Sequence, residues 1–447
     1  MKPNRLFAVL ALVVGLAGPV RAAAPEGLVL TAGDRSALVG AFGRAGLAPP
    51  AADTGDAALW NAAERLARVE LGQSLRPSEI DPLWDLAAPP RKVEAEMLQA
   101  HAQGRLAAWA GSISPDAPAY LALARARLRY AGIAAEGGWP TLPAAQRLRL
   151  GDSGEGVEAL RRRLAVEGDA PRDPPRPDLF DAPLRKALAG WQARNGLDAD
   201  GVLGPATLRR LNVPVQDRLG QIVANMERWR WMPRALPADR LEIDTGGAVG
   251  ALYRDGRVVH AFRVIPGAVK DPTPIFQSRL NAVVLNPPWN VPDRIAREEL
   301  LPRAARDPGY LARNGFIQTG GRLQQQPGPK SALGRVKFDL VSPFGVYLHD
   351  TPGRDAFQRA ERHLSHGCMR VESPLVLADL LLAPQGRGGG RMQSDLAAGA
   401  TLRIALVRQE PLFVVHWTVQ AEPDGRAGFL DDVYGWDARL ATRLARM

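Results

Sequence analysis

The stretch Tyr347–Val371, YLHDTPGRDAFQRAERHLSHGCMRV, decides how the rest of the chain is interpreted. It contains Cys368, the only cysteine of the 447 residues, at the end of the tetrapeptide Ser365–Cys368 (SHGC). A cysteine attacks as a thiolate, and about a few per cent of an ordinary thiol is ionised at neutral pH. A histidine that accepts the proton and a nearby arginine both favour the anion. We therefore expect His349 and Arg370 to activate Cys368.

The residues before the cysteine suit an acyl-transfer site. Gly367 allows a sharp turn and a close approach to a substrate carbonyl. The amides of Gly367 and Cys368, together with the His366 side chain, are candidate donors to a developing oxyanion. We assign Cys368 as nucleophile and His349 as general base and acid. Either a backbone carbonyl or the Asp350 side chain would orient the imidazole, and the sequence does not choose between them.

Two other interpretations of this segment are open. A single cysteine is often a small buried apolar residue, but Cys368 lies in a polar, glycine-containing segment. His363, His366 and Cys368 also have the side chains of a zinc site. Three ligands within six residues would be crowded, and no second Cys or His cluster completes the shell. We therefore expect neither a metal nor a cofactor.

The signature resembles that of the L,D-transpeptidases, enzymes with a YkuD catalytic domain that cross-link peptidoglycan. SHGC is followed by an apolar residue and Arg370, and His349–Pro352 (HDTP) precedes it. The large YcbB-like Gram-negative branch is the most similar. Met369 stands where a branched aliphatic residue is usual. Further matches are Asn286–Pro292 (NPPWNVP), Gln326–Lys330 (QPGPK), Lys337-Phe338 and Asp432–Gly435 (DVYG).

The resemblance implies a reaction and its partners. A tetrapeptide stem would be cut between its third residue and D-Ala, and the amine of a second stem would resolve a cysteinyl thioester into a 3→3 cross-link. Peptidoglycan stem peptides and glycan would be the partners. Arg370, Trp289 and Ser365 would contact the substrate, although Ser365 is also suited to shaping the loop.

The first residues predict export. Lys2 and Arg5 precede the apolar run 6–20, and the small residues Val20 and Ala22 fit a signal peptide over residues 1–22. We expect a periplasmic location in the Gram-negative envelope. The formal charge of +10 fits weak association with the wall or a membrane surface, although an arginine-preferring genome would also produce it. Nothing in the sequence indicates nucleic-acid binding, and it does not determine the oligomeric state.

A chain of 447 residues is too long for one core, and its patterns predict a multidomain α+β protein. Helical spacing, with Leu59, Trp60, Ala63 and Leu66 on one face and Leu121, Leu123, Ala124 and Leu128 on another, predicts a helical scaffold over 23–145. The family resemblance implies that a return segment over about 214–235 completes this scaffold domain. Residues 146–213 resemble the three-helix peptidoglycan-binding module, through Gly-x-x-Gly and Asp-Gly-x-x-Gly turns. A generic three-helix bundle is the alternative.

From residue 240 onward, apolar residues alternate in short runs that predict a mostly-β, sandwich-like or barrel-like catalytic domain over 236–447. His349 would end a strand, and Cys368 would lie before a helix that begins near Ser373. An insertion over about 292–338, helical first and then polar, predicts a lid. The C-terminal tail, including Asp432–Trp436, is expected to cover this domain.

Three alternative functions are open. The same site would act hydrolytically in an L,D-carboxypeptidase. The second alternative is a wall-binding protein whose catalytic domain is inactive. The third is a secreted thiol protease of another kind. Products formed from stem peptides distinguish these functions.

Overall fold

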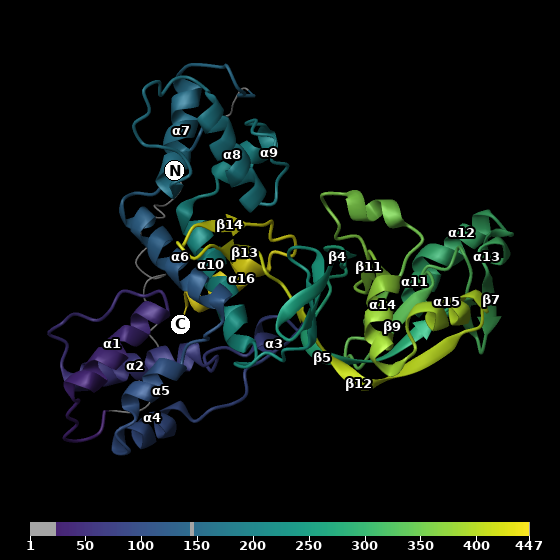
Figure 1. The fold of residues 1–447 in the computed structure, drawn as a ribbon, viewed down its shortest axis with the longest axis horizontal. Coiled ribbons are helices and arrows are strands. Elements are labelled where there is room, and N and C mark those ends of the chain that lie inside the picture. The colour runs from purple at the N-terminus through teal and green to yellow at the C-terminus, as the bar shows by residue number, and fades with distance from the viewer. Residues whose placement is uncertain (1–23, 144–146, 447) are drawn as a thin grey trace. The chain divides into compact units, whose positions relative to one another are not determined.

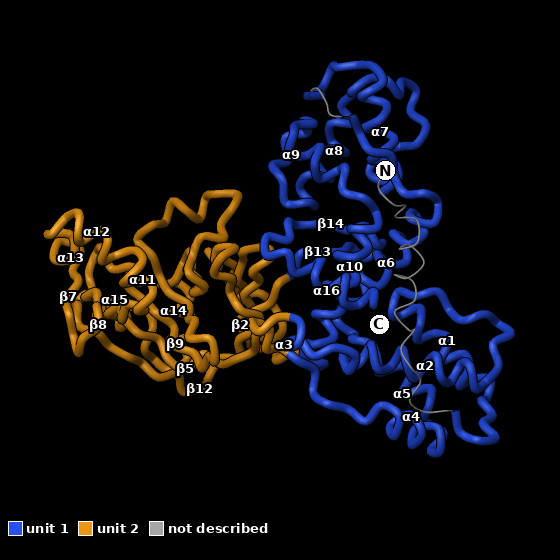
Figure 2. Tube along the Cα trace, turned by 180° about the vertical axis from the view of Figure 1, so that it is seen from behind, with its two compact units in different colours: residues 1–80, 87–234, 417–447 blue, residues 81–86, 235–416 orange. Residues whose placement is uncertain are grey.

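The computed structural model describes residues 24–143 and 147–446, which divide into two compact units (Figures 1 and 2). Unit 1 holds the described residues through Ile80, residues 87–234 and the residues from Trp417 on; unit 2 holds 81–86 and 235–416. The predicted signal peptide lies outside the described residues. Within the described ranges, no helix has both the length and the apolar character needed to cross a membrane.

The first part of unit 1 is helical, as the sequence spacing predicts. Its helices are α1 (Ala32–Arg44), α2 (Asp56–Glu70), α3 (Pro77–Ile80), α4 (Val93–Ala102), α5 (Leu106–Ser112), α6 (Pro118–Ala135) and α10 (Val215–Trp231). The expected face of α2 is buried. The prediction for α6 is only partly correct. Leu123 and Ala124 are buried as expected, but Leu128 is exposed, and Tyr120 and Tyr130 are buried instead. Two tyrosines with buried glutamate partners replace the leucines that simple spacing selects.

Three helices form the predicted module in residues 147–213, namely α7 (Glu155–Glu167), α8 (Ala182–Arg194) and α9 (Pro205–Leu211). Their shared core contains Leu160, Leu188 and Trp191. Asp181 caps α8 by accepting a hydrogen bond from the Leu184 amide at 2.9 Å. Gly204 precedes Pro205 at the first turn of α9, where a proline's missing N–H costs nothing.

The C-terminal tail does not lie with the catalytic region, contrary to our expectation that it covers that domain. Strands β13 (Val419–Ala421) and β14 (Ala427–Phe429) and helix α16 (Trp436–Leu444) belong to unit 1. Asp437 on α16 makes a 2.6 Å ion pair with Arg228 on α10, and both side chains are buried. This buried pair and the packing of α16 on α10 hold the tail on the scaffold.

The large sheet of unit 2 closes on itself. Its strands are β1 (Trp84–Asp85), β2 (Arg240–Asp244), β3 (Val249–Arg254), β4 (Arg257–Ile265), β5 (Ile275–Leu285), β9 (Val336–Leu340), β10 (Leu348–His349), β11 (Met369–Val371) and β12 (Leu402–Val415). The order is β1-β5-β12-β2-β3-β4-β11-β10-β9, and β9 also pairs with β5. The predicted Asp255-Gly256 turn joins β3 and β4, with positive φ at both residues. The predicted mostly-β fold is therefore confirmed, in a barrel-like form.

Helices α14 (Pro374–Leu382) and α15 (Gly389–Ala397) contribute Leu377, Leu381 and Leu396 to the core of this sheet. Short 3₁₀ turns occupy Arg354–Gln358 and Ala383–Gln385. Strand β12 is continuous from Leu402 to Val415, with a register shift between Ala405 and Glu410 in its pairing with β5. Such an irregularity bends a strand without ending it.

The insertion has its own small core. It contains β6 (Trp289–Asn290), α11 (Asp293–Ile295), a π-helical turn Ala296–Leu300, α12 (Leu301–Arg306), α13 (Tyr310–Arg313), β7 (Phe316–Thr319) and β8 (Arg322–Gln325). In Figure 1, α11, α12, α13 and β7 lie together. Ile295, Leu300, Phe316 and Leu323 are buried against one another. The second half, which is polar in sequence, contributes β7 and β8, and these two strands form a three-stranded sheet with β6.

Candidate active site

Three neighbouring strands carry the predicted nucleophile and base. His349 on β10 is paired with Arg370 on β11 and with Lys337 on β9. Leu348 and its partner Met369 point into the core, so the residues on either side of them share the opposite face. Cys368 lies one residue before β11, level with Tyr347 by continuation of the register. From ordinary strand spacing, the Cα atoms of Cys368 and His349 are about 8 Å apart.

A backbone carbonyl orients the imidazole. Nδ1–H of His349 donates to the carbonyl of Asp350 at 2.6 Å, which leaves the lone pair on Nε2. The Asp350 carboxylate has other partners: it accepts from the amides of Arg335 and Thr351 and from the Arg354 guanidinium. Of the two orienting groups left open by the sequence, the structure therefore has the carbonyl. This tautomer suits a base that acts through Nε2.

His349 is neutral at ordinary pH. Burial lowers the pKa of His349 to about 3, although the hydrogen bond to Asp350 opposes the shift. The positive charges of Arg370 and Lys337 lower this pKa further. Because the ring resists a resting proton, it is available as a base and gives up an acquired proton readily.

The Cys368 sulfur is half-buried and interacts with Tyr347. Burial raises the pKa of the Cys368 thiol, and this outweighs the opposing hydrogen bonds from the backbone and side chain of Tyr347. Lys337 and Arg370 also favour the thiolate. These neighbours alone do not ionise the resting thiol, because desolvation exceeds their help. The resting pair is a thiol beside a neutral imidazole.

Tyr347 is the functional neighbour that sequence reasoning missed. Its phenol interacts with both the Cys368 sulfur and the Trp289 side chain, and burial raises the pKa of Tyr347 far above its ordinary range. The Lys337 Nζ atom lies 4.5 Å from the centroid of the Tyr347 ring. The signal was alternation along a strand, since Tyr347 and His349 are two residues apart and must share a face.

The loop before the nucleophile is fixed by internal hydrogen bonds. The Ser365 hydroxyl donates to the Cys368 carbonyl at 2.5 Å and accepts from the Gly367 amide at 3.1 Å. Ser365 is buried, so it shapes the loop and does not face a substrate. The Gly367 amide, a predicted oxyanion donor, is already used in this network. Gly367 has φ +100°, a backbone conformation that residues with a side chain rarely adopt. A Cβ there would meet only ordinary contacts, so the backbone angle and not crowding favours glycine.

The two remaining histidines of the segment have separate partners. Nε2 of His366 donates to Glu299 of the π-helical turn at 2.5 Å, so this nitrogen is not available as an oxyanion donor. His363 uses Nδ1 with Glu361 and Nε2 with the Thr245 carbonyl. These bonds separate the three side chains that formed the alternative zinc site. Among the described residues, no group of three or more His, Cys, Asp or Glu side chains could hold a metal ion.

The predicted substrate contacts differ in position. Arg370 is half-buried beside His349 and Cys368, where its charge faces the reacting groups. Trp289 on β6 is half-buried and joins the site through Tyr347. Both are at the site, whereas Ser365 lies beneath it.

Sequence comparisons agree with this geometry. Residues 238–393 match the family described as "L,D-transpeptidase catalytic domain" (YkuD), and residues 153–211 match "Putative peptidoglycan binding domain". A Haemophilus influenzae protein named "Putative L,D-transpeptidase" is 36% identical over 209 residues, or 42% of this chain and 42% of that protein. The match thus spans less than half of that relative.

Two solved structures are similar at low identity. An L,D-transpeptidase (residues 123–326) from Xylanimonas cellulosilytica is 17% identical, with 61% of this chain and 98% of that chain covered and a TM-score of 0.22. An L,D-transpeptidase from Mycobacterium smegmatis is 15% identical, with 40% and 58% covered and a TM-score of 0.22. Residues 238–393 are thus similar to the L,D-transpeptidase catalytic domain (YkuD) family, and residues 153–211 to the peptidoglycan-binding domain family.

Proposed function

We propose that this chain is an L,D-transpeptidase of the periplasm that forms 3→3 peptidoglycan cross-links through a thioester on Cys368. One observation carries the proposal: Cys368 and His349 share one face of adjacent strands, with His349 Nδ1 bound to the Asp350 carbonyl. That arrangement supports proton transfer from sulfur to Nε2. The signal peptide expected over residues 1–22 supports the location.

The first half of the reaction would acylate the enzyme. Since the pKa of Cys368 is raised by burial, its proton passes to His349 Nε2 as the sulfur attacks the carbonyl of the third stem residue. The S–C bond forms, and the C–N bond to D-Ala breaks. His349 returns its proton to the departing amine of D-Ala. The charges of Lys337 and Arg370 favour the anionic transition state.

The second half would form the cross-link. The side-chain amine on the third residue of another stem attacks the thioester and loses a proton to His349. The new C–N bond forms, the C–S bond breaks, and the proton returns to sulfur. The Cys368 amide and the Tyr347 hydroxyl support the oxyanion, because the Gly367 amide and His366 Nε2 already have partners. A donor of this kind contributes about 3 kcal/mol.

Product analysis tests the reaction. The purified full chain is incubated with a disaccharide-tetrapeptide and the products are identified by mass spectrometry. A dimer that has lost one D-Ala supports transpeptidation, whereas a tripeptide alone indicates the L,D-carboxypeptidase. Cys368→Ala should abolish either product while leaving sacculus binding intact. Absence of turnover in the wild type, with binding retained, would instead identify a non-catalytic wall-binding protein.

A second measurement reports on the nucleophile alone. By the family resemblance, incubation with a carbapenem should add one acyl group to the intact mass, located on Cys368. The Cys368→Ala variant should gain no mass. An adduct at any other residue, or none, contradicts the assignment of Cys368.

A further inference from the structure

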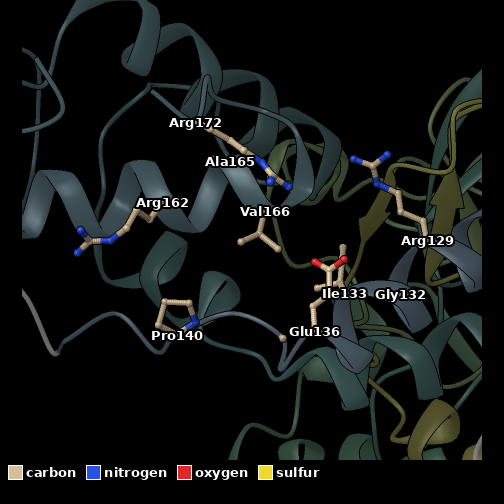
Figure 3. A pocket seen from close by; sticks show the side chains of 10 residues that line it. Arg129, Gly132, Ile133, Glu136, Pro140, Arg162, Ala165, Val166 and Arg172 are labelled. Atoms are coloured by element: carbon tan, nitrogen blue, oxygen red, sulfur yellow. The ribbon is translucent and has the colours of Figure 1, made fainter. Parts of the chain in front are cut away.

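Two of the three arginines that line a pocket in unit 1 already have partners in the protein. The pocket lies between α6 and α7 and has a volume of about 590 Å³ (Figure 3). The Arg129 guanidinium donates to the Glu167 carbonyl at 2.8 Å. Arg162 lies 3.4 Å from Glu158 and points away from the pocket. The pocket therefore supports no ligand assignment, whereas a buried histidine of unit 2 supports a definite role.

His363, five residues before Cys368, bridges two distant parts of unit 2. Its side chain is buried. Nδ1 lies 2.6 Å from Glu361 Oε1, and Nε2 lies 2.7 Å from the carbonyl oxygen of Thr245, directly after β2. Thr245 and His363 are 118 residues apart in the sequence. The ring thus ties the segment that precedes the nucleophile to the end of β2.

Both oxygens that face the ring accept hydrogen bonds. A peptide carbonyl only accepts, and so does an ionised carboxylate. Burial would raise the pKa of Glu361, but hydrogen bonds from the His363 amide and ring, and the charge of that ring, lower it, so the carboxyl group is ionised. A neutral imidazole has one N–H, whereas an imidazolium has two. The two contacts together therefore require the doubly protonated ring.

Other ionisable groups lie on each element around this bridge. The Asp244 carboxylate, at the end of β2, accepts from the Gly247 amide at 3.2 Å. Arg362 donates to the Gly247 carbonyl, also at 3.2 Å. His416, after β12, has Nδ1 2.8 Å from the Thr245 hydroxyl. A change of charge at Glu361 leaves these three groups and their contacts in place.

The bridge continues to Cys368 through the residues that follow His363. The amides of Leu364 and Ser365 both donate to the Pro266 carbonyl at 3.0 Å. The Ser365 hydroxyl in turn holds the Cys368 carbonyl. The segment is thus fixed at the end of β2 and at the loop after β4. Because each step is hydrogen-bonded, a displacement of His363 would be passed on to Cys368.

We propose that His363 is a positioning residue for the nucleophile: its doubly protonated ring holds the segment before Cys368, and the reaction slows when the ring releases one proton to solvent. After that loss, one of the two contacts sets a nitrogen lone pair against an oxygen, which is unfavourable in a buried position. The effect on the reaction rests on the proposed function, whereas the bridge rests on its geometry alone.

Glu361→Gln is the decisive variant. An amide can donate to Nδ1, so a neutral His363 keeps both contacts and the second proton is no longer needed. The Glu361 side chain is mostly exposed, so the fold should persist. Asp355→Asn removes the same charge from another exposed side chain between β10 and β11 and is the matched control. His363→Gln cannot span both oxygens and should lower turnover at every pH.

Turnover of a soluble stem peptide by the full chain is measured from pH 6 to pH 9. Each variant rate is divided by the wild-type rate, so that titration of the catalytic groups and of the acceptor amine cancels. The ratio for Glu361→Gln should be near one at pH 6 and should rise about threefold or more by pH 9, with KM unchanged. The ratio for Asp355→Asn should stay flat. A ratio for Glu361→Gln that does not rise, or an equal rise in Asp355→Asn, would overturn the proposal.

Two further measurements do not depend on turnover. Nitrogen-15 spectra of labelled histidine, assigned with His363→Gln, should show at pH 7.5 a share of doubly protonated His363 at least twice as large in wild type as in Glu361→Gln. The hydrogen-exchange protection factor of the Ser365 amide should fall between pH 6 and pH 9 in wild type only. If both hold but the wild type shows no turnover, the catalytic proposal fails and the bridge stands. If turnover is normal but His363 carries one proton at pH 6, only the bridge fails.

Discussion

Glu299 Oε1 lies 2.5 Å from His366 Nε2, so a side chain of the insertion contacts the signature loop two positions before Cys368. A second ion pair, between Arg294 and Asp271 at 2.7 Å, joins the same part of the insertion to the loop that packs under Gly367. The insertion is thus tied at its base to the nucleophile loop. A lid that moved as a whole would have to break both pairs.

The Glu299 contact gives the first prediction. Glu299→Gln replaces an ionic hydrogen bond by a neutral one, with a loss of about 1 kcal/mol because both side chains are partly exposed. Turnover of soluble donor peptide should fall about three- to tenfold. Steady-state rates measure this. The neighbouring exposed Glu298→Gln removes the same charge without touching His366 and should stay near wild type; equal effects in both variants would contradict the role of the pair.

The second prediction concerns thiol reactivity. The Tyr347 hydroxyl lowers the pKa of Cys368 against the opposing effect of burial, so Tyr347→Phe should raise that pKa further. The pH profile of iodoacetamide alkylation should therefore move to higher pH. Tyr253→Phe, on β3, removes a phenol that stacks on Arg240 and is the matched control. A profile unchanged in Tyr347→Phe would exclude the phenol as a partner of the sulfur.

The third prediction follows from the buried imidazole. His349 has a folded-state pKa of about 3, below its ordinary value near 6.5, so below pH 6.5 the unfolded chain takes up a proton that the folded chain refuses. The contribution of neutral His349 to the free energy of unfolding is fully present above pH 6.5 and is lost as the pH falls toward 3. The slope approaches about 1.4 kcal/mol per pH unit.

The non-titrating variant His349→Gln isolates this effect. The difference in unfolding free energy between wild type and variant should shrink between pH 6 and pH 4, as measured by urea titration with hydrogen exchange of β9–β11. A difference that is constant with pH would mean that His349 is protonated in the folded state as readily as in the unfolded one.

The fourth prediction concerns the glycine of the signature. Gly367→Ala forces an L side chain to φ +100°, at a cost of at least about 1 kcal/mol, so the loop should shift and turnover should fall at least tenfold. Circular dichroism should show a retained fold. Gly353→Ala, at φ −82°, is the control and should be tolerated. Full activity in Gly367→Ala would mean that the loop geometry is not needed for catalysis.

Local patterns predicted the elements that hold the base and the peptidoglycan-binding-type module. His349 ends a strand, and α14 begins at Pro374, next to the expected Ser373. Strand β11 was missed, because three residues between a loop and a helix give no readable alternation. The hairpin of β7 and β8 had a signal, since Gly320 and Gly321 both have positive φ, as two-residue hairpin turns require.

Contacts between distant residues could not be predicted. The pairing of Glu299 with His366 depends on how the insertion folds, and no periodicity in either segment encodes it. The raised pKa of Cys368 could not be predicted either, for a similar reason. The sequence displays the nearby charges but not the burial that outweighs them.

The path of the chain between the two units has a consequence for the synthesis of the protein and for the expression of its fragments. Residues 81–86, within the N-terminal half of the chain, belong to unit 2. From residue 235 the chain stays in unit 2 and returns to unit 1 only at Trp417. During synthesis the ribosome must therefore release the whole catalytic region before β13, β14 and α16 can join their helices. A gene fragment for residues 235–416 would lack β1, and a fragment that ends at residue 234 would lack β13, β14 and α16, so neither fragment contains a whole unit.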